Sequence, residues 1–249
     1  MITKEKNLFF LQKKKNKIVS FDVEWTKNYR IKKGNKSFCF SLVFFDNFSK
    51  KLVKEEDIRF GFQMAYAQNL LEIKKITTLA EEKLSFFLKN NFLFIGHQLC
   101  SDLSVLRAYG SQSHNLIKLQ KIWKRRKSPN YSRLFDSRFD IKTLKNKSRR
   151  LVDVCEELNL IVTQPELKGS SMTSMQNNFY NTKEKLLYEK IAVLNIRHSL
   201  STGLIYLLLT KKIKWLRKIN VNQILYNNIK DDFSYINSPE FIQLLDEKQ

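Results

Sequence analysis

Residues 17–25 read Lys-Ile-Val-Ser-Phe-Asp-Val-Glu-Trp, an apolar run that passes into strict alternation of apolar and polar side chains. This pattern predicts a half-buried strand. Because side chains two apart on a strand point to the same face, Asp22 and Glu24 would project side by side. Adjacent carboxylates repel each other unless a positive charge lies between them, and paired oxygens are ligands that Mg²⁺ or Mn²⁺ prefers. The pair indicates a divalent metal site or, in the simpler interpretation, a polar strand face in water.

The segments that follow predict an α/β fold. Residues 38–45 are aromatic and β-branched, a third short strand is expected within 52–62, and short turns join these strands into an antiparallel meander. The period then changes to that of a helix over 71–90, followed by the continuous apolar run 92–95 of a buried parallel strand and a short strand at 134–137. We therefore predict a mixed five-stranded sheet, a meander plus parallel strands, flanked by helices as in the ribonuclease H-like architecture.

The second half of the chain is predicted to be mostly helical. Apolar residues recur at helical spacing over 151–158 and 185–209, whereas 163–181 has the most loop-like composition. Three parts follow from these patterns: a basic lead-in with few structural signals (1–16), one domain (17–210), and a basic helical tail with a helix around Trp215 (211–249).

Composition limits the function classes. The chain of 249 residues has 45 Lys and Arg against 24 Asp and Glu, a formal charge of +21, which favours nucleic acid first and anionic membrane surfaces second. Cys39, Cys100 and Cys155 have no metal-site spacing and indicate a reducing compartment. The N-terminus lacks a signal peptide, and the apolar run 204–209 is too short to span a membrane. We expect a cytoplasmic protein without a membrane partner.

A second acidic motif follows the predicted inner strand. Gly96 permits a tight exit from that strand, and Asp102 is expected to start the next helix. Ligands bind at the carboxyl ends of strands in open α/β sheets, so Asp102 is a candidate to face Asp22 and Glu24. An ordinary helix cap is the alternative for Asp102.

Basic residues surround an aromatic residue further along. Six cations, Arg126 and its neighbours among them, lie within 118–127 around Trp123, and Tyr131 follows closely. Such interleaving suits neutralisation of a nucleic-acid backbone together with base stacking, or simply a solvated helix face.

With these segments in view, the chain resembles the DEDD superfamily of 3′–5′ exonucleases, which includes ribonuclease D and the proofreading domains of DNA polymerases. Residues 21–25 (Phe-Asp-Val-Glu-Trp) look like its first motif, an Asp-x-Glu on the first strand. Residues 96–103 resemble the second, Gly-His-Asn-x-x-Phe-Asp-Leu, with Gln98 in place of Asn and Ser101 in place of Phe. Residues 135–137 are similar to a short Asp-Thr strand that often follows. The resemblance spans roughly residues 17–210.

The third motif departs from the family, which carries its last Asp in Tyr-x-x-x-Asp or His-x-x-x-x-Asp on a late helix. Residues 194–203 contain no Asp or Glu. In the first register His198 replaces the Asp, and in the second His198 is the family's His and Gly203 replaces the Asp. We prefer the first, since the residues around His198 resemble the Tyr-type helix. A packed polar residue is the alternative for His198.

The resemblance implies a ligand set for two Mg²⁺ or Mn²⁺ ions, or one if the incomplete set holds only one. Asp22 would contact both ions, Glu24 and the last motif position would hold the water-activating ion, and Asp102 the other. Because His198 supplies no negative charge, Mg²⁺ binding should weaken and Mn²⁺ become relatively better.

The implied activity is metal-dependent 3′–5′ exonucleolytic hydrolysis of single-stranded DNA or RNA ends, with Asp22, Glu24, Asp102 and His198 as catalytic residues. Trp25 and His97 are the expected substrate contacts, although Trp25 could equally belong to the core. Two alternatives stay open: a degenerate exonuclease fold that binds nucleic acid without cutting, and a ribonuclease H-fold nuclease that cuts internally.

Overall fold

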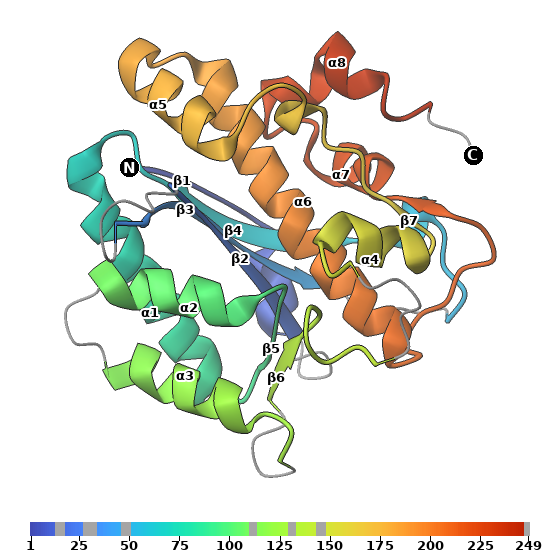
Figure 1. The fold of residues 1–249 in the computed structure, drawn as a ribbon. Helices are drawn as coiled ribbons and strands as arrows, with labels where there is room; N and C mark the ends of the chain where they lie inside the picture. Colours follow the sequence, from blue (N-terminus) through green and yellow to red (C-terminus); the bar gives the residue numbers. More distant parts are fainter. Residues whose placement is uncertain are drawn as a thin grey trace.

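The computed structural model describes residues 1–12, 18–26, 34–45, 51–109, 114–128, 133–142 and 148–246. Its centre is a six-stranded sheet in the order β1-β4-β3-β2-β5-β6 (Figure 1). The strands are β1 (Ile2–Lys6), β2 (Ile18–Thr26), β3 (Lys36–Phe45), β4 (Phe60–Tyr66), β5 (Leu93–Gly96) and β6 (Leu134–Asp136).

The sheet is mixed, as the sequence predicts. Strands β2, β3 and β4 form an antiparallel meander, and β1 lies antiparallel to β4. Strand β5 pairs in parallel with β2, with Ile18 opposite Leu93, and β6 pairs in parallel with β5, with Phe94 opposite Leu134. The predicted α/β class, with a meander and parallel strands, is confirmed.

The predicted number of five strands is wrong, because the lead-in supplies a sixth. Residues Ile2–Lys6 pair along the edge of β4, from Ile2 opposite Tyr66 to Lys6 opposite Phe62. Every residue of β4 is buried, so that edge needs a partner strand. Four of the five residues of β1 are polar, which hid the strand from a search for apolar runs. Residues 13–16 of the lead-in lie outside the described residues.

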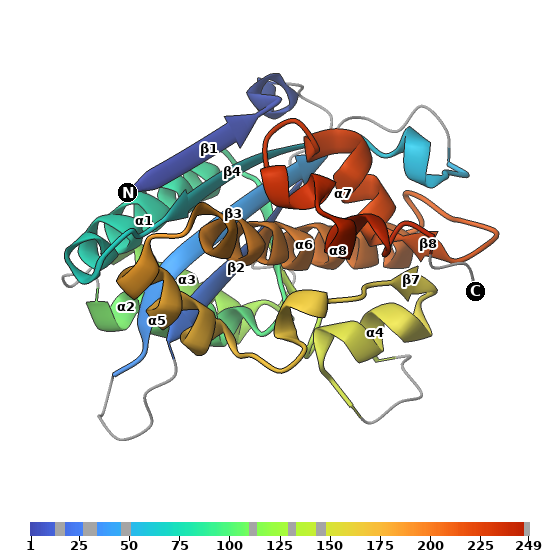
Figure 2. The same cartoon turned by 90° about the horizontal axis from the view of Figure 1, so that it is seen from above.

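Helices cover both faces of the sheet (Figures 1 and 2). Helices α1 and α2 lie on one face, where the rings of Phe87 and Phe94 meet at 6.2 Å. The long helix α6 lies on the other, with α5 and α7 beside it. The helices are α1 (Ile73–Lys89), α2 (Leu99–Tyr109), α3 (His114–Arg125), α4 (Leu151–Glu157), α5 (Met172–Thr182), α6 (Lys185–Leu209), α7 (Val221–Ile229) and α8 (Pro239–Ile242).

Two local predictions for the second half are wrong. The segment predicted as a loop contains α5, which begins at an ordinary cap, since the Ser171 hydroxyl accepts from the backbone amide of Ser174. Trp215 lies outside any helix, in the connection between α6 and the two-residue strand β8 (Ile219–Asn220), which pairs with β7 (Leu160–Ile161). Its indole N–H donates to the carbonyl of Leu158, 3.3 Å away.

Helix α6 is a core helix. It is long and apolar enough to cross a membrane by length and composition, and no other helix in the described ranges passes that test. In the protein, however, 83% of its apolar window is buried. An apolar surface all round the helix therefore reflects its position between the sheet and the C-terminal segment.

A buried ion pair ties α6 to the rest of the second half. Arg197 of α6 is fully buried, and its guanidinium donates to both carboxylate oxygens of Glu166, each at 2.8 Å. Its Nε donates to the side chain of Asn222 in α7 at 2.7 Å, and the Tyr235 hydroxyl donates to Glu166 at 2.9 Å. The pair thus joins α6, the turn at Pro165–Leu167 and the C-terminal segment around one charged centre.

Replacement of Glu166 by Gln should destabilise the protein by about 3–5 kcal/mol at pH 7, because Arg197 would keep a buried charge without its counter-ion. Burial raises the pKa of Glu166, but the charge and hydrogen bonds of Arg197 outweigh burial and hold the pKa below its ordinary value of 4.5. The stabilisation is therefore complete above pH 4.5 and is lost as the pH falls through the folded-state pKa.

Urea unfolding at a series of pH values measures this effect. The difference between wild type and Glu166→Gln should shrink as the pH falls below 4.5. Glu156→Gln, which changes an exposed residue of α4, is the matched control and should stay within about 0.5 kcal/mol of wild type. A difference that does not vary with pH would contradict the ion-pair account.

Candidate metal centre

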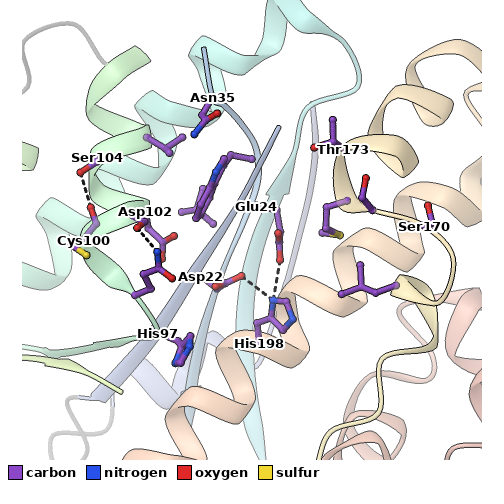
Figure 3. Close-up of a pocket in the computed structure, with 18 residues that line it drawn as sticks. Asp22, Glu24, Asn35, His97, Cys100, Asp102, Ser104, Ser170, Thr173 and His198 are labelled. Carbon is purple, nitrogen blue, oxygen red and sulfur yellow. Dashed lines mark hydrogen bonds and ion pairs between the residues drawn. The ribbon is translucent and has the colours of Figure 1, made fainter. Parts of the chain in front are cut away.

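Strand β2 carries the acidic pair on the face that α6 covers (Figure 3). Phe21 and Val23 are buried toward the opposite face, and Asp22 and Glu24 alternate with them, as the sequence predicts. The pairing with β3 shifts register between Glu24 and Trp25. Such a bulge bends a strand and redirects its side chains, and here it coincides with the end of the acidic pair.

Small side chains let α6 approach this face closely. The Ser41 hydroxyl of β3 donates to the backbone carbonyl of Asn195 at 3.0 Å and lies 2.7 Å from the Ser199 hydroxyl. One turn further along, a Cβ at Gly203 would stand 2.5 Å from the ring of Phe45 and 3.3 Å from Cβ of Ser20. The helix is thus held at a distance that only serine and glycine permit.

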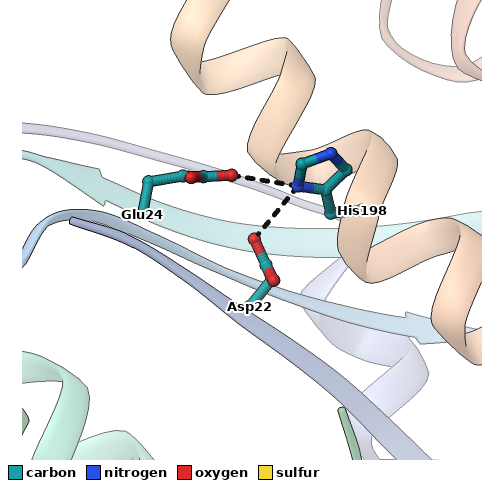
Figure 4. A group of neighbouring side chains, drawn as sticks. All are labelled: Asp22, Glu24 and His198. Carbon is teal, nitrogen blue, oxygen red and sulfur yellow. Dashed lines mark hydrogen bonds and ion pairs between the residues drawn. The ribbon is translucent and has the colours of Figure 1, made fainter. Parts of the chain in front are cut away.

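The close approach brings His198 onto the acidic pair (Figure 4). Its Nδ1 lies 2.9 Å from Oε1 of Glu24 and 3.5 Å from Oδ2 of Asp22. The ligand atoms of these three residues all lie within 4.8 Å of one another. On the same helix face, the amide of Asn195 donates to Oδ2 of Asp22 at 2.6 Å, and the other ring nitrogen of His198 lies 2.9 Å from the amide of Gln164.

Glu24 and His198 shift each other's pKa values, and the neighbouring Asp22 shifts both of these pKa values. Burial lowers the pKa of His198, but hydrogen bonds and charges of Asp22 and Glu24 outweigh burial and raise the pKa to about 10. The raised pKa favours the protonated imidazole at neutral pH, and the ring donates to Glu24 through Nδ1. Burial raises the pKa of Glu24, the hydrogen bond from His198 opposes that rise, and the neighbouring charge of Asp22 adds to it.

Asp102 reaches the same pocket from α2. The helix begins at Leu99, so Asp102 lies in its first turn rather than at its N-cap, and the helix-cap interpretation is wrong. The side chain is 1% exposed, and its Oδ2 has no hydrogen-bond partner among the described residues. Burial, followed by the charges of Asp22 and Glu24, raises the pKa of Asp102 well above its ordinary range. It is not a member of the close group of three.

The turn between β5 and α2 positions Asp102. Gln98 adopts a left-handed conformation with φ of 62°, which is uncommon for a residue with a side chain. Its backbone amide donates to Oδ1 of Asp136 at 2.9 Å, and Oδ2 of Asp136 accepts from the indole N–H of Trp123 at 2.9 Å. Asp136 therefore holds the turn through its hydrogen bonds and does not line the pocket.

The pocket has a volume of about 1060 Å³. All six residues singled out from the sequence line it: Asp22, Glu24, Trp25, His97, Asp102 and His198. His97 lies 2.8 Å from the Ser137 hydroxyl through Nδ1, while its Nε2 is buried without a partner among the described residues. Burial lowers the pKa of His97 to about 4, so the ring is neutral at pH 7.

Sequence reasoning missed two side chains that contact the acidic group. Asn195 precedes His198 by three residues, so helical spacing alone puts the two on one face, and that signal could have found it. Gln164 comes from the connection between β7 and α5, and no pattern in the sequence links it to His198. Ser170 and Ser171 line the pocket on the α5 side.

These residues suit a divalent cation. Two carboxylates and one imidazole offer ligand atoms in a compact group, and the unpartnered oxygen of Asp102 lies in the same pocket. Carboxylates with raised pKa values in a buried site are stabilised when a positive ion binds. His198, whose pKa is raised, supplies positive charge to Asp22 and Glu24 in this structure.

His198→Asp should bind Mn²⁺ about tenfold tighter or more than wild type, because it exchanges a cation for a third carboxylate. Isothermal titration calorimetry measures both affinities. The matched control is His114→Asp, which makes the same substitution at an exposed histidine of α3 and should bind as wild type does. Equal affinities for wild type and His198→Asp would contradict a metal site at this group.

Gly203→Ala should destabilise the protein by about 1–3 kcal/mol, since the added methyl group would press on the ring of Phe45. Urea unfolding gives the change. Gly203→Ala should cost less stability in a Phe45→Leu background than in the wild-type background, because the side chains at the two positions compete for the same space. Additive losses would show that the two sites do not compete for one space.

No protein-family model, no curated protein and no solved structure matches this chain. What the chain does must therefore be inferred from the pocket and from the motifs that form it.

Proposed function

We propose that this chain is a metal-dependent phosphodiester hydrolase with a ribonuclease H-like fold, acting at the 3′ ends of single-stranded DNA or RNA. The observation that carries the proposal is the convergence of Asp22, Glu24, Asp102 and His198 on one pocket. They come from β2, α2 and α6, and their chain order is that of the three motifs of the DEDD exonucleases.

The topology supports the fold part of the proposal. The order β4-β3-β2-β5-β6, with an antiparallel meander followed by two parallel strands, is the arrangement expected of a ribonuclease H-like sheet, to which β1 adds an edge. Asp22 and Glu24 lie on the strand at the junction between the antiparallel and parallel halves. Such a junction is where ligand sites form in open α/β sheets.

The position of His198 supports the first register of the third motif. His198 contacts Asp22 and Glu24, whereas Gly203 lies against Phe45 and Ser20 and does not line the pocket. A carboxylate at 203 would first have to displace the Phe45 ring. We therefore infer that His198 occupies the place where the exonucleases carry their last Asp.

Asp22 and Glu24 would hold Mg²⁺ or Mn²⁺ from β2, with Asp102 on the α2 side and His198 on the α6 side. When bound, such ions neutralise the phosphate and lower the pKa of a water molecule that attacks phosphorus. Asn195 keeps one oxygen of Asp22 in place through its hydrogen bond. His198 must lose its proton before Nδ1 can act as a ligand. An imidazole ligand favours Mn²⁺ over Mg²⁺ at this position.

Two other pocket residues are suited to the nucleotide. Trp25 is half-buried and lines the pocket beside the acidic pair, where its ring is available for stacking on a base. His97 is neutral, and its Nε2 has no hydrogen-bond partner within the described ranges, so that nitrogen would be available to a phosphate or sugar oxygen.

Asp22→Asn and Asp102→Asn should each lower hydrolysis of end-labelled single strands in Mn²⁺ by a factor on the order of 100 or more, because each removes a carboxylate that would hold an ion. Wild type should release single nucleotides from the 3′ end, and a 3′-terminal block should stop it. Asp231→Asn, at an exposed position beyond α7, is the matched control and should cut as wild type does. No hydrolysis above the Asp22→Asn level would refute the enzyme.

A second candidate function is nucleic-acid binding without hydrolysis by the same fold. It is favoured by one observation: His198 contacts Asp22 and Glu24 at the place where the exonucleases have their last acid. Salt-sensitive binding by wild type and Asp22→Asn alike, with no cleavage by either, would identify it. Cleavage into fragments instead of single nucleotides would identify the remaining alternative, internal cutting.

A further inference from the structure

The stretch that follows Asp102 carries no negative charge. Residues 103–135 contain eight Lys and Arg and no Asp or Glu, although the chain has 24 acids in all. The described parts of this stretch are 103–109, 114–128 and 133–135, which comprise most of α2, the whole of α3 and the start of β6. The positive charges of this segment therefore lie apart from the carboxylates that line the pocket.

Helix α3 turns one side to the core and its cations to solvent. Leu116 and Leu119 are buried, whereas Lys118, Lys121 and Lys124 are exposed. Within the described part of the chain, no ion pair joins any of these three lysines to an acid. We call Lys118, Lys121 and Lys124 the α3 cationic face. They lie within seven residues, and the rise from Lys118 to Lys124 is about 9 Å.

The nearby aromatic and acidic side chains are committed to the fold. Trp123 donates its N–H to Asp136, and the Arg126 guanidinium stacks over its ring at 4.2 Å. Arg126 also pairs with Asp140 at 2.8 Å. Trp123 is therefore held as a structural residue rather than presented to bases. Asp140 is paired with Arg126, and no ion pair joins Asp136 or Asp140 to the three lysines in the described part of the chain.

Helix α3 contacts the α2 wall of the pocket through Gln120. Ser104 of α2 lines the pocket, and its hydroxyl accepts from the Gln120 amide of α3 at 3.2 Å. Arg107 of α2 donates to the same Gln120 side chain at 2.8 Å. Figure 3 shows Ser104 on the α2 side of the pocket near Asp102, and Figure 1 shows α3 alongside α2.

We propose that the α3 cationic face binds the phosphate backbone of a nucleic-acid strand whose end occupies the pocket. Unpaired lysines along 9 Å of helix match the axial length of about two to three nucleotides at 3.4 Å each. Contacts of this kind position a strand without reading its bases. The proposal rests on the proposed function for its choice of polyanion, and it assigns the part of the strand that lies outside the pocket.

The test compares two triple variants of equal charge. Lys118, Lys121 and Lys124 are all changed to Gln in one, and exposed Lys212, Lys214 and Lys218, on the connection between α6 and α7, are changed to Gln in the other. Binding of a labelled single strand of about 20 nucleotides is followed by fluorescence anisotropy over a range of salt concentrations. The buffer contains EDTA, so that no hydrolysis is needed for the result.

The α3 variant should bind about tenfold more weakly. Its slope of log K against log salt should be smaller in magnitude by about 2, because each of the three lost phosphate contacts contributes about 0.7. The control variant should keep the wild-type slope. Equal losses in both variants, an unchanged α3 variant, or no binding by wild type would each overturn the proposal. Circular dichroism shows whether the variants are folded.

A second readout separates this proposal from the proposed function. In Mn²⁺, the p-nitrophenyl ester of thymidine 5′-monophosphate can occupy the pocket but cannot reach α3. The α3 variant should hydrolyse it at the wild-type rate while losing about tenfold in kcat/KM on the long strand, whereas Asp22→Asn should lose both. If wild type cuts neither substrate, the enzyme is refuted while the binding result still decides the α3 face. If the α3 variant loses kcat/KM equally on both substrates, the proposed role of the α3 cationic face is overturned.

Discussion

The close contact between α6 and the sheet is the interaction on which the rest of the structure depends. Serine side chains at 20, 41 and 199 and the missing side chain of Gly203 let the helix backbone approach β2 and β3. On its other side, Arg197 anchors the helix to Glu166 and the C-terminal segment. His198 is the next residue after that anchor, so its position over Asp22 and Glu24 follows from packing on both sides of α6.

Charge is divided between the inside and the outside of this protein. Its formal charge is +21, yet several of its acids are buried, among them Asp102, Asp136, Glu166 and Glu189. Buried carboxylates need a cation or a set of hydrogen-bond donors. Glu166 has Arg197, Asp136 has an indole and two backbone amides, and Glu24 has His198. Asp102 has an oxygen with no partner among the described residues, which is the feature most characteristic of a binding site.

Local patterns predicted those elements whose environment is repeated along them. The alternation over 17–25 predicted β2, because a strand with one buried face alternates apolar and polar residues. The apolar run over 92–95 predicted β5, because a strand buried on both faces is apolar throughout. Strand β1 was missed because an edge strand with four polar residues out of five has almost no apolar periodicity. Helix α5 was missed because its sequence, rich in Asn, Ser and Thr, has weak helix propensity, and packing against α6 compensates for it.

The sequence by itself determined that Asp22 and Glu24 share a face, that Asp102 follows an inner strand, and that the expected last acid is absent, since these depend on spacing along one element. Only the tertiary structure decided that His198 lies between the two carboxylates, that Asn195 donates to Asp22 and Gln164 contacts His198, and that Gly203 faces the sheet instead. Those relations join residues far apart in the chain. They are set by how closely α6 packs against β2 and β3, which no local pattern encodes.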